Sequence, residues 1–146
     1  MKELSGSASA EVAAPLENCL ALVESVEAYP SWYPEVVKAV DVLERDAQGT
    51  ATKIHAKLHL SQGPLKRDFE LTMAVGVDRP ATVRLTRIPH GPDDEERFEV
   101  VWRLAEHRIA VELSAMLPVP RFVPLGGIGD TAARGFVDAA VRALDA

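Results

Sequence analysis

The sequence predicts an α+β fold in which a curved antiparallel sheet of six to seven strands packs around a long C-terminal helix, with two short helices after the first strand. Two observations support this prediction. Between residues 36 and 117, apolar and polar side chains alternate along stretches joined by short turns, a pattern typical of antiparallel strands. Residues 128–146 instead repeat apolar side chains every three or four positions, which indicates one amphipathic helix.

The N-terminal part is expected to form one strand and two short helices. Residues 5–13 carry small and β-compatible side chains, and Pro15 suits the first turn of the following helix, because its missing N–H has no partner there in any case. Apolar side chains recur at helical spacing over residues 16–26. Pro30 ends that helix, since the residue before a proline is pushed out of the α region. Residues 31–33 are expected to form a second helical turn.

The other strands have one apolar and one polar face, as expected for an antiparallel sheet with one face in water. Short turns connect them, which favours sequential hairpins over βαβ crossovers. The expected strands cover residues 36–45, 50–61, 66–77, 82–88, 97–104 and 109–117.

The predicted helix is too narrow to cover this sheet. A helix with its side chains is about 10–12 Å wide, and six or seven twisted strands are much wider. Aromatic residues make up only 5% of the chain, so few large side chains can fill the space between helix and sheet. We therefore expect an apolar cavity, the usual form of a small-molecule site. The alternative is a core that leucine and valine side chains pack shut.

Size and charge limit the classes of function. The 146 residues fit a single domain, 1–146. The net charge of −6 argues against a nucleic-acid partner. The single cysteine excludes an internal disulfide, and no apolar run approaches the ~20 residues of a membrane-spanning helix. Because the N-terminus also lacks the apolar core of a secretion signal, we expect a cytoplasmic protein. A homodimer is left open.

Three segments resemble a known family. Residues 10–15 (Ala-Glu-Val-Ala-Ala-Pro), the helix that follows and residues 26–40 resemble the opening of the polyketide cyclase/dehydrase group of the START-like (SRPBCC) superfamily, and residues 63–69 resemble its third-to-fourth strand hairpin. The resemblance implies the helix-grip fold over nearly the whole chain. The superfamily includes aromatase/cyclases, lipid-transfer domains, coenzyme Q-binding proteins and ribosome-associated toxins. No catalytic signature of any one of them matches here residue by residue.

The expected ligand-binding residues lie on the inward strand faces, at the aromatic corner, on the proline-rich segment 117–127 and on the last helix. They are Trp32, Tyr33, Ile54, Phe69, Met73, Arg87, Phe98, Trp102, Leu113, Phe122 and Phe136.

Two of these residues allow a second interpretation. Trp32 can stack on a ligand at the cavity entrance, but plugging the corner between the small helices and the sheet is the more frequent role of such a side chain. Strict alternation with Val83 and Leu85 directs Arg87 inward. A buried guanidinium needs an anionic or carbonyl partner, which a ligand could supply. Alternatively, Arg87 extends its head from the strand end into water.

The remaining reactive residues give no catalytic pattern. His55 and His59 share a polar strand face with lysines and are expected on the surface, and no third ligand lies at zinc-binding spacing. We therefore predict no metal and no cofactor. Cys19 lies on the apolar stripe of the first helix and is expected in the core. Residues 93–96 are expected to be a solvated hairpin tip. The apolar loop 118–127 is expected to be a lid over the ligand. The alternatives are a contact surface and a loop packed onto the sheet edge.

Three functions are compatible with these residues. The leading hypothesis is a protein that binds a small hydrophobic, aromatic or polyketide-like molecule between sheet and helix. For an enzyme, the resemblance implies cyclisation or dehydration of a polyketide-type substrate, and whether the chain has enzymatic activity is left open. The second is a non-catalytic carrier of a lipid or of a coenzyme Q-like isoprenoid. The third is a protein-interaction module with a filled core.

Overall fold

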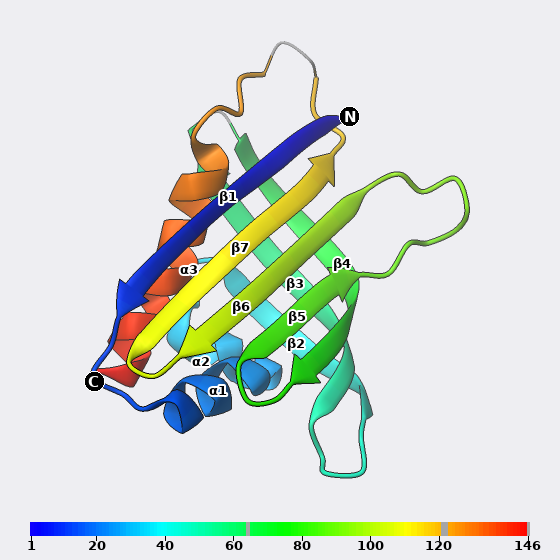
Figure 1. The fold of residues 1–146 in the computed structure, drawn as a ribbon. Coiled ribbons are helices and arrows are strands. Elements are labelled where there is room, and N and C mark those ends of the chain that lie inside the picture. Colours follow the sequence, from blue (N-terminus) through cyan, green and yellow to red (C-terminus); the bar gives the residue numbers. More distant parts are fainter. Residues whose placement is uncertain (64, 121–122, 146) are drawn as a thin grey trace.

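The computed structural model describes residues 1–63, 65–120 and 123–145. In this part of the chain the elements follow the predicted order of one strand, short helices, six strands and a long helix (Figure 1). Their bounds are β1 Lys2–Glu11, α1 Leu16–Glu24, a 3₁₀ turn η1 Val26–Ala28, α2 Tyr29–Trp32, β2 Val37–Arg45, β3 Ala51–Gln62, β4 Leu65–Asp78, β5 Thr82–Arg87, β6 Arg97–Ala105, β7 Arg108–Leu117 and α3 Ile128–Leu144.

The strands form one seven-stranded antiparallel sheet in the order β1-β7-β6-β5-β4-β3-β2. Every neighbouring pair except β1 and β7 is a sequential hairpin, as predicted. The sheet curves so that β3 and β4 pass behind β6 and β7 in Figure 1, and α3 packs mainly on β1 and β7. This is the predicted helix-grip fold. No helix of the described part is long and apolar enough to cross a membrane.

Alternation places the inward side chains as predicted. Ile54 on β3 is paired with Met73 on β4, and Leu58 is paired with Phe69. All four are nearly inaccessible to solvent, as are Ala56 and Leu71, the pair between them. The alternate residues, such as Lys57 and Glu70, face outward. One face of the β3–β4 hairpin therefore contributes a continuous apolar wall to the interior.

The prediction for the aromatic corner was wrong in its details. Tyr29 and Pro30 belong to α2 itself, and the expected turn at residues 31–33 is shifted toward the N-terminus. Pro30 occupies a first-turn position of α2, where its missing N–H costs no helical hydrogen bond. The first helix correspondingly ends at Glu24, and the 3₁₀ turn takes up the next residues.

Two glycines bring α3 into backbone contact with β1. A Cβ atom built on Gly6 would lie 2.0 Å from the carbonyl carbon of Gly129, so only glycine fits at this crossing. One residue further along each chain, the Ser7 N–H donates to Asp130 Oδ1 over 3.0 Å. Strand β1 is an edge of the sheet, and α3 covers it at this point. The first turn of the helix is thereby fixed to the sheet.

Candidate functional site

A cavity lies between the curved sheet and the helices. Its volume is about 30 Å³, enough for roughly one water molecule. Strands β2 to β6 form most of its wall, η1 and α2 close one side, and α3 contributes a single residue. The lining is Val26, Tyr29, Val37, Val40, Ile54, Ala56, Leu58, Met73, Leu85, Phe98, Val100 and Phe136.

Four of the predicted ligand-binding residues line this cavity, namely Ile54, Met73, Phe98 and Phe136. Alternation along the strands identified the first three, because it separates the two faces of the sheet, and helical spacing identified Phe136. Other lining residues on β2 to β6, such as Ala56, share this inward pattern and could have been found in the same way. The lining residues on η1 and α2 could not have been predicted from this pattern, because the path of the chain around Pro30 determines which side chains there face inward.

An aromatic cluster adjoins the cavity at α2. The Tyr29 and Trp32 ring centroids lie 4.8 Å apart, and Trp32 meets Trp102 edge-on at 6.4 Å. Tyr33 and Trp102 each pack edge-on against Phe136, at 4.9 Å and 6.2 Å. Within this cluster, Tyr29 and Phe136 line the cavity, and the other three rings stand behind them. Trp32 therefore occupies the corner between the small helices and the sheet.

Both tyrosines of the chain are held in their neutral form. Burial raises the pKa of Tyr29 well above its usual value. The Tyr29 hydroxyl donates to the Val23 carbonyl over 2.5 Å. Burial likewise raises the pKa of Tyr33 to about 12. Neither phenol is a proton acceptor near neutral pH.

Arg87 is buried at the end of β5, with only 7% of its side chain exposed. It points inward as strict alternation predicts, since Leu85 precedes it on the same face and Met73 is its partner across the β4–β5 ladder. Nη2 donates to Asp94 Oδ2 and Nη1 donates to the Glu96 carbonyl, both over 2.8 Å. The chain itself thus supplies the anionic and carbonyl partners that a buried guanidinium requires.

The expectation that residues 93–96 form only a solvated tip was wrong for Asp94. The side chain of Asp94 is 14% exposed and accepts hydrogen bonds from Arg87 and from the backbone N–H groups of His90 and Glu96. The hydrogen bond from Arg87 is the main reason why the pKa of Asp94 lies well below its usual value. Asp94 therefore stays ionised and fixes the β5–β6 loop to the inward guanidinium.

Two other predicted residues lie away from the cavity lining. Leu113 is buried on β7, and Phe69 is buried on β4 beneath the Arg67 guanidinium, whose carbon lies 5.2 Å from the ring centroid. Phe122 lies outside the described residues. The structure thus groups part of the predicted set around the cavity and distributes its other described members over the surrounding core.

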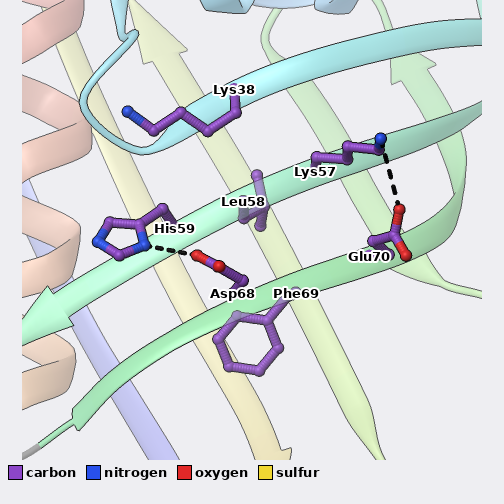
Figure 2. A pocket seen from close by; sticks show the side chains of 7 residues that line it. All are labelled: Lys38, Lys57, Leu58, His59, Asp68, Phe69 and Glu70. Atoms are coloured by element: carbon purple, nitrogen blue, oxygen red, sulfur yellow. Dashed lines mark hydrogen bonds and ion pairs between the residues drawn. The ribbon is translucent and has the colours of Figure 1, made fainter.

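A second hollow, an open groove of about 600 Å³, lies over strands β2, β3 and β4 (Figure 2). Paired charges border it: His59 Nδ1 lies 2.5 Å from Asp68 Oδ1, and Lys57 Nζ lies 3.7 Å from Glu70 Oε1. These partners face each other across the β3–β4 ladder. Such exposed cross-strand pairs are ordinary features of a solvated sheet face, so we assign the groove no ligand.

The histidines form no metal centre in the described part of the chain, where no group of three His, Cys, Asp or Glu side chains could hold an ion. His55 and His59 lie on the outer sheet face with Glu70 and Asp68 as partners. His107 adopts φ 60° in the β6–β7 turn, and its Nδ1 lies 3.0 Å from the Ala13 carbonyl. Each of these histidines therefore has a partner within the fold.

Comparison with solved structures identifies the same fold in proteins of low sequence identity. A START superfamily protein from Mycobacterium smegmatis is 19% identical, with a TM-score of 0.69 and 97% of each chain covered. A conserved protein from Geobacillus kaustophilus is 14% identical, with a TM-score of 0.67 and coverages of 98% and 95%. The Zhui aromatase/cyclase from a Streptomyces species is 15% identical, with a TM-score of 0.60 and coverages of 98% and 94%.

The sequence comparisons give a more definite result. No curated protein matches the chain. The family model described as "Polyketide cyclase / dehydrase and lipid transport" matches residues 12–145, which include every element from α1 to α3. The chain therefore belongs to the polyketide cyclase/dehydrase and lipid transport family.

Proposed function

We propose that the protein binds a small, mainly apolar molecule in the interior, between the sheet and α3. The observation that carries this proposal is the apolar lining of the interior cavity, where Leu85 and Met73 are strand neighbours of the buried Arg87. Small-molecule sites are commonly concave and apolar with a few fixed polar groups. Membership of a family whose description includes lipid transport supports the same assignment.

Binding requires the interior to widen. The cavity holds about 30 Å³, whereas ligand sites usually measure ~300 Å³ or more. Two lining side chains would have to move: Met73, which is unbranched and flexible, and Phe136, the one lining residue on α3. A ligand would displace these two side chains and occupy the space between β2–β6 and α3.

The proposed binding residues are those predicted from the sequence, in two roles. Ile54, Met73, Phe98 and Phe136 would contact the apolar body of the ligand directly, and Arg87 would meet its polar group. The side chains behind them would set the shape of the widened site. These are Trp32, Tyr33, Phe69, Trp102 and Leu113. Phe122 lies outside the described residues and stays a predicted contact.

A cyclase or dehydrase would use the same site. The widened interior would hold reacting carbons close together, and Arg87 would polarise a carbonyl as negative charge develops on its oxygen. A carrier of a lipid or isoprenoid would need the apolar lining alone. Turnover of an offered polyketide supports the enzyme, whereas native mass spectrometry that detects a co-purified lipid supports the carrier.

The small volume of the cavity favours one further candidate, a protein-interaction module with a filled core. In such a module the interior would serve stability only, and a partner would bind the outer surface. A ligand-binding protein should be stabilised by a small apolar molecule, whereas an interaction module with a filled core should not.

The test is a thermal-shift screen of the purified protein with aromatic, isoprenoid and fatty ligands. A ligand that binds the folded state at a hundred times its Kd stabilises it by about 2.7 kcal/mol. For a chain of this size the expected rise in melting temperature is roughly 5–10 °C. If no compound raises the melting temperature, the interior is a filled core and the proposal fails.

A further inference from the structure

The two edges of the sheet differ in what covers them. At one edge, α3 crosses β1 and is fixed to it near Gly6. At the other edge, η1 and α2 pack on β2, but every side chain from Leu43 to Arg45 is exposed. An unpaired edge strand presents N–H and C=O groups to which another chain can add a strand. The C-terminal half of β2 is therefore open to a partner strand.

Strand β2 also carries an exposed apolar side chain at this edge. Leu43 is 51% exposed, and among the described residues Met1 is the only other large apolar residue that is exposed. The β2–β3 register shifts on both sides of residues 39–42. Such irregularities shorten the part of an edge that can pair. A partner of β2 would thus meet a short regular segment with a leucine at its end.

The sequence of β2 is complementary to itself when two copies run antiparallel. A two-fold axis through Asp41, perpendicular to the sheet, places Lys38 of one copy opposite Glu44 of the other, and the symmetry forms this pair twice. Both side chains lie on the outer sheet face, because Lys38 borders the outer groove beside Lys57 (Figure 2) and Glu44 faces Lys53 across the β2–β3 ladder. Opposite charges on facing strands stabilise a sheet.

The same register brings apolar side chains together. Leu43 lies opposite Ala39 of the second copy, and Val40 lies opposite Val42. Both valines are only partly buried within one copy, so the contact would remove further apolar surface from water. Asp41 meets its own counterpart on the axis. This pair is unfavourable, because like charges directly opposite each other repel.

The axis at Asp41 is also the one that overlaps the whole strand, because Asp41 is the middle residue of β2. Shifting the axis by one residue in either direction sets a charged side chain against a valine, namely Glu44 against Val40 or Lys38 against Val42. Length of overlap and charge complementarity therefore favour the same register.

We propose that the free edge of β2 binds a second copy of this chain, so that two β2 strands pair antiparallel around a two-fold axis at Asp41 and the two sheets become continuous. This inference is independent of the interior ligand. The pairing is short, and contacts that bury less than about 1,200 Å² are typically weak or transient. We therefore expect a monomer–dimer equilibrium rather than a permanent dimer.

Sedimentation velocity over a concentration series tests for this dimer. One chain has a mass of 15.8 kDa. The average mass of the wild-type protein should rise toward twice that value as the concentration approaches about 1 mM, the range in which weak contacts become populated.

Charge reversals at Lys38 and Glu44 test the register. Lys38→Glu alone and Glu44→Lys alone each place like charges at both pairs, so each variant should dimerise at least about tenfold more weakly than the wild type. In an equimolar mixture of the two variants, both pairs again join opposite charges, and the mixed dimer should recover the wild-type affinity. The matched controls are Lys66→Glu and Glu3→Lys, because both residues are exposed on strands that do not pair with β2. Neither control should weaken the dimer.

Asp41→Asn separates this register from an alternative that also pairs charges. Removing the like charges on the axis should strengthen the dimer about threefold. An axis at Leu43 would instead pair Asp41 with Arg45 over residues 41–45, and there the same substitution would weaken the dimer.

Several results would overturn the proposal. A wild-type chain that stays monomeric up to about 1 mM would exclude the second copy as the partner of β2. The proposed pairing would also be wrong if the reversals left the dimer unchanged, if the mixture did not recover the affinity, or if the Asp41→Asn dimer were no tighter than the wild-type dimer. Circular dichroism checks that each variant folds, as expected for exposed positions. If a reversal variant does not fold, the wild-type series and Asp41→Asn still decide.

Discussion

Arg87 is a charged residue on the inward face of β5, and the chain stabilises it through an acid seven residues away. Alternation along the strand was sufficient to predict its direction, because the period of two fixes the face. The partner could not be predicted, since Asp94 lies in a loop whose path depends on the β5–β6 turn. Strand periodicity therefore predicts the direction in which the Arg87 side chain points, whereas the conformation of the loop determines which residue pairs with it.

The Asp94–Arg87 pair predicts a pH dependence of stability. Hydrogen bonding by Arg87 lowers the pKa of Asp94 in the folded state, below the unfolded value of about 3.9. The ionised carboxylate therefore stabilises the fold above about pH 4, and this contribution is lost as the pH falls toward the folded-state pKa. Asp94→Asn should lower the free energy of unfolding at pH 7. The difference from the wild type should shrink as the pH falls from 5 to 2. Urea unfolding at several pH values measures the difference.

The outer-face residue Asp68 provides the control, because its side chain is 85% exposed. Asp68→Asn should change the stability little at pH 7. An Asp94→Asn variant as stable as the wild type at pH 7 would contradict the role given to the buried pair.

The two tyrosines predict a spectroscopic signature of the aromatic cluster. Burial raises the pKa of Tyr33 to about 12 and that of Tyr29 still higher, whereas an exposed tyrosine titrates near pH 10. Because the chain has no other tyrosine, the folded protein should show almost no phenolate absorbance at 295 nm at pH 10.5. Urea-unfolded protein should show a largely ionised signal at the same pH. Phenolate absorbance near half its maximum in the folded protein at pH 10 would refute the buried placement.

Helix α3 and strand β1 show how two elements far apart in sequence fit together. The helix was predictable from its apolar periodicity, and the strand from its small, β-compatible side chains. The crossing itself was not, because neither glycine shows in sequence which backbone it will meet. Gly6 and Gly129 allow the close approach, and Arg134 Nη1 donates to the Ser9 carbonyl further along the same pair of elements. These contacts hold α3 against β1 along one side of the helix.

Gly129→Ala tests this crossing. A Cβ at Gly129 would lie 1.9 Å from the Ser5 carbonyl oxygen, so backbone would have to shift. We expect a loss of about 3 kcal/mol or more in the free energy of unfolding, at the upper end of overpacking effects. Gly126→Ala is the matched control, because a Cβ there would meet no atom within 4 Å. Equal unfolding midpoints of the two variants in urea would show that the crossing is loose.

At the scale of the whole molecule, the sequence was sufficient to predict the fold but not the volume of the interior. Alternating strands, the short helices and one long amphipathic helix determine the helix-grip arrangement. The space between helix and sheet is mostly filled and leaves only about 30 Å³, because side chains such as Ile54 and Leu58 of β3 and Phe136 of α3 converge on it. How densely the interior packs depends on how the side chains interdigitate. A comparison of the widths of helix and sheet takes no account of this packing.

The most direct test of an interior ligand site is to fill it. Ala56 lines the cavity on β3 and is 3% exposed, so the two extra methyl groups of Ala56→Val would occupy most of its volume. Ala74→Val, on the outer face of β4, is the control. Calorimetric titration with 2-acetonaphthone should show binding at least tenfold weaker in Ala56→Val than in Ala74→Val. Equal affinities in the two variants would place the ligand elsewhere and contradict the account.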